Sequence, residues 1–156
     1  MKYRQLTKEQ FEELHEEFAK FLATQQIDAT EWKTIKKSKP EVAEEEMNLF
    51  SDMVWDGVLK KVNYLEHFSS DNLNLFRCDA ENIQRIVVTA TKDNFDFLKD
   101  TDYKWFVENS KDDSIEYFKG QKPYLKDRNL EIFELIEKGS VISKGDLFEG
   151  VLKLIS

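Results

Sequence analysis

Cysteine, proline, glycine and histidine are all scarce in this chain of 156 residues, which has one Cys, two Pro, five Gly and two His. The single cysteine, Cys78, excludes a disulfide within the chain, and its place beside Phe76 predicts a buried thiol rather than a reactive one. The glycines are isolated from one another, whereas phosphate-binding loops need clustered glycines. Neither histidine has a Gly-flanked nucleophile as a companion. The sequence therefore predicts no cofactor and no catalytic residue, and favours a protein that is not an enzyme.

Long apolar runs and blocks of positive charge are also missing. No run approaches the ~18 apolar residues that a membrane span needs, and residues 1–6 lack an apolar export segment. The net charge is −8, from 31 acidic and 23 basic residues that are spread evenly along the chain. Nucleic-acid binders usually concentrate Lys and Arg on one face or in one tail. We therefore expect a cytoplasmic protein that binds neither membrane nor nucleic acid.

Material for a hydrophobic core is plentiful. Hydrophobic residues make up 40% of the chain, including 12 Phe, 3 Trp and 5 Tyr. A chain of this length suits one domain that needs neither a metal nor a disulfide to fold. We expect a single helical domain over residues 1–156.

Four positions carry the pattern of a helix start. In each, an apolar residue precedes a capping residue, and a polar and an apolar residue follow three and four positions after the cap. The capping residues are Thr7, Asp28, Asp79 and Ser143. Repeated starts of this kind indicate a helical fold.

Apolar residues at spacings of three and four predict the helices themselves. The longest stripe runs from Val42 to Phe68 after an expected cap at Ser38, and it is apolar around much of its circumference. Such a helix is packed by several neighbours, so the sequence predicts an all-α fold of six or seven helices around a long central helix at about residues 40–68. The other helices are expected at residues 8–24, 28–37, 103–107, 115–118, 129–138 and 144–155, and residues 79–90 are assigned to helix in preference to strand.

One region is ambiguous between helix and strand. Leu73–Phe76 fits either a short strand or a helical turn, and Ile86–Thr89 contains β-branched residues that favour strand. The alternative is therefore an α+β fold with a small two-stranded element within residues 73–91.

For function, the absence of chemical motifs favours a non-enzymatic protein-protein interaction module, a regulator or accessory subunit that binds another protein. Aromatic side chains dominate the energy of many interfaces, and Trp55 and Leu59 turn away from the centre of the main apolar stripe. Together with the neighbouring Asp52 and Asp56, they form the candidate partner-binding surface.

Two other functions remain open. Glu12-x-x-His15 matches half of a di-iron bundle motif, and His67 follows Tyr64 at the same spacing. The second function is therefore an enzyme or sensor with a carboxylate–histidine metal site, which would use Glu12, His15 and His67. The third function is an acidic decoy that competes with nucleic acid for a basic protein.

The stretch from Lys39 to Trp55, continued by Tyr64–Phe68, resembles a small uncharacterised protein family of Bacteroidetes-type bacteria. The first ten residues and Val141–Gly145 are similar to that family too. The resemblance implies a cytoplasmic bacterial setting, and it brings no activity and no catalytic residue with it.

Overall fold

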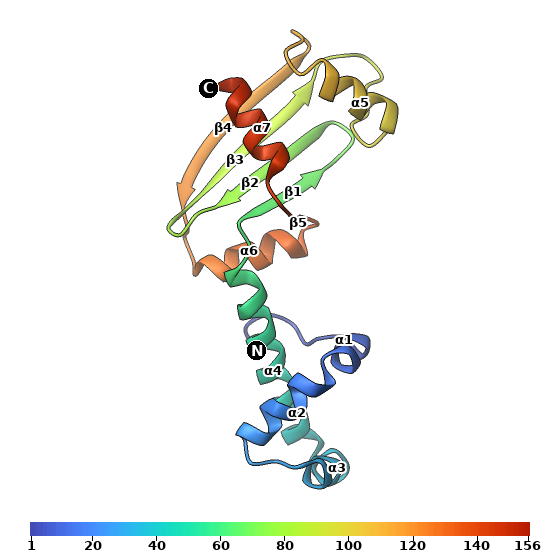
Figure 1. Ribbon diagram of the computed structural model, residues 1–156, viewed down its shortest axis with the longest axis vertical. Coiled ribbons are helices and arrows are strands. Elements are labelled where there is room, and N and C mark those ends of the chain that lie inside the picture. Colours follow the sequence, from blue (N-terminus) through green and yellow to red (C-terminus); the bar gives the residue numbers. More distant parts are fainter. The chain divides into compact units, whose positions relative to one another are not determined.

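The computed structural model describes all residues, 1–156, and the chain divides into two compact units, Met1–Lys60 and Lys61–Ser156. The first unit is helical. Figure 1 shows its four helices, α1 (Lys8–Glu13), α2 (His15–Thr24), α3 (Ala29–Ser38) and α4 (Pro40–Lys60).

Two of the expected helix starts in this unit are confirmed. The Thr7 side chain accepts a hydrogen bond from the Gln10 backbone N–H in a complete capping box, and the Asp28 side chain accepts one from the Glu31 N–H. The single helix predicted for residues 8–24 is instead two helices that meet at Leu14. Ser38 does not cap α4, because it is the last residue of α3 and its hydroxyl donates to the Thr34 carbonyl.

Aromatic rings pack the helical unit together. The ring of Phe18 in α2 lies 5.0 Å from that of the fully buried Phe50 in α4 and 5.3 Å from that of Trp32 in α3, measured between centroids. The buried hydroxyl of Ser51 accepts a hydrogen bond from the Leu6 N–H at 3.0 Å, which fixes the N-terminal segment to α4. These helices are thus held by side-chain packing rather than by helix propensity alone.

The second unit is a five-stranded antiparallel sheet with three helices (Figure 1). The strand order is β4-β3-β2-β1-β5. The strands are β1 (Tyr64–Phe68), β2 (Asn72–Cys78), β3 (Asn82–Ala90), β4 (Ile115–Pro123) and β5 (Val141–Ser143), and the helices are α5 (Asp100–Glu108), α6 (Arg128–Glu137) and α7 (Asp146–Ile155).

One face of the sheet forms the main core. Leu73 pairs with Val88 and Leu75 with Ile86, and all four side chains are fully buried. Phe148 and Val151 of α7 and Phe106 of α5 belong to the same buried cluster. Figure 1 shows α7 lying across the strands. Because successive side chains point to opposite faces, this packing fixes which residues occupy the other face.

Helix α6 lies against the other face of the sheet. Phe76, Cys78 and Ile83 lie on this face and are buried. Arg128, the first residue of α6, donates hydrogen bonds to the carbonyls of Val62 and Cys78, at 2.5 and 3.0 Å. The guanidinium group thereby ties the start of α6 to the chain before β1 and to the end of β2.

The all-α prediction was wrong, because residues 64–90 form three strands. The central helix ends at Lys60 rather than near residue 68, and the predicted helix at 79–90 is β3, with Asp79 in the β2–β3 hairpin. Strands with apolar residues on both faces carry consecutive apolar positions, as in Ile86–Val88, and such runs also satisfy helical spacing. The alternative two-stranded element lies in the right region but includes only part of the sheet.

The predicted helix at residues 115–118 is also wrong, since these residues belong to β4. The last two predicted helices are confirmed as α6 and α7. The residue that precedes α7 is Gly145 rather than Ser143, which lies in β5 and accepts a hydrogen bond from the Gly145 N–H through its hydroxyl. None of the seven helices combines the length and the apolar character that crossing a membrane requires.

Gly145 should be intolerant of substitution. Its φ of +88° is strained for other residues, and a Cβ there would overlap the ring of Tyr64. We expect Gly145→Ala to lower the free energy of unfolding by about 2 kcal/mol or more. Gly150→Ala is the matched control, because Gly150 lies in α7 with open space around it. This variant should raise the free energy of unfolding by up to about 1 kcal/mol. Urea denaturation of both variants measures the difference, and equal stability would contradict the packing of Tyr64 against Gly145.

Candidate functional site

A groove of about 710 Å³ lies on the second face of the sheet, next to α6. Its lining comes from β1 to β4 on one side and from α6 and the residues after it on the other. Five apolar side chains take part, Phe76, Ile83, Val87, Phe118 and Leu135. Phe118 is 54% exposed, so part of this apolar surface is open to solvent.

The charged side chains of the groove are mostly basic, although the protein as a whole has a net charge of −8. They are Arg85, Lys122 and Lys138, with Glu131 and Glu134 as the acidic residues. The imidazole of His67 also lines the groove, whereas Lys119 contributes only its place on the strand, because it pairs with Ile86 on the opposite face. Glu131 pairs with Lys122 at 3.6 Å, and Glu134 pairs with Lys126 at 2.7 Å. Arg85 and Lys138 are left without a carboxylate partner.

Arg85 is held along the sheet surface by Asn74. Its Nε and one terminal nitrogen donate to Asn74 Oδ1, at 2.9 and 2.5 Å, and its guanidinium carbon lies 5.9 Å from the centre of the Phe76 ring. Asn74 in turn donates to Asn72 Oδ1 at 2.7 Å. These neutral contacts orient the guanidinium group without cancelling its charge, so Arg85 can still pair with an anion.

His67 lies where the groove meets the segment that follows α6. Gly139, with a φ of +115°, brings the backbone so close that a Cβ would lie 3.2 Å from the Nε2 of His67. The imidazole therefore packs against the chain on this side.

The partner-binding residues expected on α4 contact the chain's own N-terminal segment. Asp52 accepts hydrogen bonds from the backbone N–H groups of Lys2 and Tyr3, at 2.7 and 2.9 Å. Asp56 accepts one from the Tyr3 hydroxyl, and burial together with this bond raises the pKa of Tyr3 to about 12.

Trp55 and Leu59 complete that set. The ring of Trp55 is partly buried, 6.5 Å from the ring of Tyr3, and the guanidinium group of Arg4 lies 5.0 Å from its centre. Leu59 is fully buried. The structure thus brings Trp55, Asp52 and Asp56 together around residues 2–4, and it leaves no Leu59 surface for a partner.

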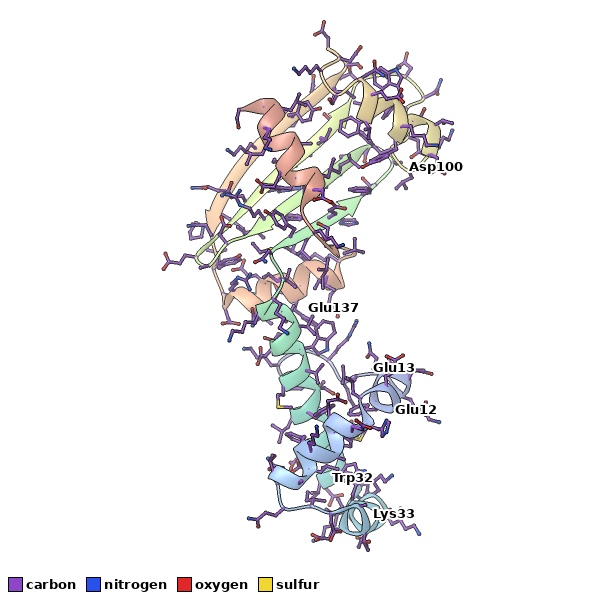
Figure 2. The ribbon with its side chains drawn as sticks, viewed as in Figure 1. Glu12, Glu13, Trp32, Lys33, Asp100 and Glu137 are labelled. Carbon is purple, nitrogen blue, oxygen red and sulfur yellow. The ribbon has the colours of Figure 1, made fainter.

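The three residues of the metal alternative are not assembled into a site. Glu12 lies on α1 (Figure 2), and the Nδ1 of His15 is 2.9 Å from the backbone carbonyl of Glu12 rather than from its carboxylate. His67 belongs to the other unit, in the groove described above. Nowhere in the chain do three His, Cys, Asp or Glu side chains converge in a way that could hold a metal ion.

Of the groove residues, only His67 was among the sequence candidates, in the metal alternative. A helix was expected at residues 79–90 and 115–118, and this placed Arg85 and Phe118 on helices instead of on neighbouring strands. A strand assignment would have revealed them, because alternation puts Arg85 and Val87 on one face of β3 and Phe118 and Lys122 on the same face of β4.

The fold and the groove define an α+β protein in which a helical unit precedes an antiparallel sheet with one covered and one partly open face. The chain belongs to the family of unknown function DUF6495, whose sequence profile matches residues 1–156. The expected membership of an uncharacterised family is therefore confirmed. No curated protein and no solved structure matches the chain.

The thiol of Cys78 should be unreactive in the folded protein. It is buried, as the sequence predicted, and burial raises its pKa to about 12 from 9.0. At neutral pH the thiolate fraction is then on the order of a thousandfold lower than in the unfolded chain. A colorimetric thiol reagent should label the native protein at least about a hundredfold more slowly than the protein in denaturant.

The control for this labelling is the double variant Cys78→Ser with Ser70→Cys, which moves the only thiol to an exposed position in the same unit. Its native and denatured labelling rates should be similar. Rapid labelling of native wild-type protein would contradict the burial of Cys78.

Proposed function

We propose that the protein is a non-enzymatic interaction module, a regulator or accessory subunit of a cytoplasmic bacterial complex, and that the groove binds an acidic segment of its partner protein. One observation carries the proposal. Two cations, Arg85 and Lys138, line an apolar groove without carboxylate partners in a protein whose net charge is −8.

Charge complementarity favours an acidic occupant. Carboxylates of a bound segment would pair with Arg85 and Lys138, and its apolar side chains would cover Val87, Phe118 and Leu135. Such pairing selects partners and speeds their association. The same cations would oppose a basic segment.

The open shape of the groove favours a chain segment over a small molecule. Sites for small molecules enclose most of their ligand. Here the residues from Phe118 to Lys122 are all exposed, so the groove follows the surface of a strand. The α4 residues give weaker support to a partner surface, because Leu59 is buried and Asp52 already accepts two backbone hydrogen bonds.

The test uses a fluorescein-labelled peptide, called here the acidic probe. In its extended form, alternating Glu and Leu side chains lie on one face and Thr side chains lie on the other. Its control carries Lys in place of Glu. We expect the acidic probe to bind with an affinity that falls as salt is added, measured by fluorescence anisotropy. The Lys peptide should bind at least about tenfold more weakly. Preferred binding of the Lys peptide would contradict the proposal and favour the acidic decoy.

Charge reversal in the groove should weaken binding of the acidic probe. Arg85→Glu and Lys138→Glu each replace an attraction of about 1.5 kcal/mol or more by a repulsion, so each should lower the affinity at least about tenfold. Lys153→Glu is the control, because Lys153 lies in the last turn of α7, outside the groove. If all three variants bind the acidic probe equally well, the groove is not the binding surface.

A further inference from the structure

The strand β4 has a free edge beside the groove. It is the first strand in the sheet order, it spans nine residues, and Phe118–Pro123 are all exposed. Between Glu116 and Lys122, its backbone makes no hydrogen bond to any segment other than β3. An edge of this kind can accept a further strand.

The hydrogen bonds at the two ends of β4 reveal which backbone groups face outward. Thr91 N–H donates to the Ser114 carbonyl at one end, and Tyr124 N–H donates to the Glu81 carbonyl at the other, in the same register as the β3–β4 ladder. Hydrogen-bonded positions alternate in an antiparallel pair. The even-numbered residues of β4 therefore bond to β3, and Tyr117, Lys119 and Gln121 turn their N–H and C=O groups toward the open edge.

Gly120 leaves space for a ligand in the middle of this strand. A glycine weakens a strand interior, and its φ is outside the left-handed region, so backbone conformation does not require it. A Cβ at Gly120 would meet nothing within 4 Å. Its register partner, Arg85, extends instead toward Asn74. Glycine at such a position is typical of a close approach by another backbone or a ligand.

The charges on β4 favour an acidic partner over a second copy of this chain as the strand that pairs with its edge. Lys119 and Lys122 lie on the strand itself. Pairing of two β4 strands would bring the lysines of both copies together, which is unfavourable, whereas an acidic strand would be attracted. The opposite edge of the sheet, β5, has only three residues and offers a much shorter template.

From these observations we infer that the acidic partner segment binds in extended form as a sixth strand along β4. It pairs with the outward backbone groups of Tyr117, Lys119 and Gln121, and one face of its side chains enters the groove over Gly120. This inference rests on the proposed function, and it adds the mode of recognition.

The first experiment removes one outward N–H. Gln121→Pro deletes a donor that the native ladder does not use, and an edge strand tolerates proline at such a position. Gln121→Val removes the same side chain but keeps the N–H. We expect Gln121→Pro to lower the affinity for the acidic probe at least about tenfold, and Gln121→Val to retain wild-type affinity. Thermal unfolding of both variants verifies that they are folded.

A second pair of variants does not depend on proline. Gly120→Val fills the space over the strand with a β-branched residue that strands favour, so it should fold at least as well as wild type and lose binding of the acidic probe. Glu116→Val is the matched control, on the same face of β4 and outside the groove, and it should bind like wild type.

The outcomes separate the two proposals. If Arg85→Glu weakens binding while Gln121→Pro and Gly120→Val do not, the groove binds acidic segments and strand addition is wrong. If the wild-type protein does not bind the acidic probe at all, both the proposed function and the strand-addition inference are wrong.

Discussion

The burial of one sheet face is the constraint on which the Lys61–Ser156 unit depends. Leu73, Leu75, Ile86 and Val88 are fully removed from water beneath α7 and α5. Burying side chains of this size contributes about 1.5–3 kcal/mol each. A shift of the register by one residue would turn all of them toward the other face, so their burial also determines where every other side chain of β2 and β3 points. The groove lies on the remaining face, next to α6.

The sequence predicted the helices that have a polar side better than it predicted the sheet. The Thr7 and Asp28 caps, α6 and α7 were predictable, because capping residues and amphipathic spacing are local signals. Strands β1 to β3 were not, since two buried faces give runs such as Ile86–Val88 in which helical and strand periods cannot be separated. The spacing of Leu65 and Phe68 extended the apparent stripe of α4 beyond Lys60 in the same way.

The candidate site was missed because it depends on pairing between strands. Arg85 and Gly120 are 35 positions apart in the chain and become neighbours only through the β3–β4 register. Nothing local distinguishes Gly120, which follows the helix predicted at residues 115–118, from a glycine at a helix end. The α4 candidates were chosen for their aromatic and acidic character, and the structure explains this character through contacts with Tyr3 and Arg4. The local basic surface was hidden by an even spread of charge along the sequence.

Amide hydrogen exchange of β4, with and without the acidic probe, tests the central claim most directly. In the free protein, the amides of Phe118, Gly120 and Lys122 should be protected by β3, and those of Tyr117, Lys119 and Gln121 should exchange rapidly. At saturation with the acidic probe, the account predicts that these three rapid amides become protected. Rapid exchange at all three in the saturated complex would contradict binding along the β4 edge.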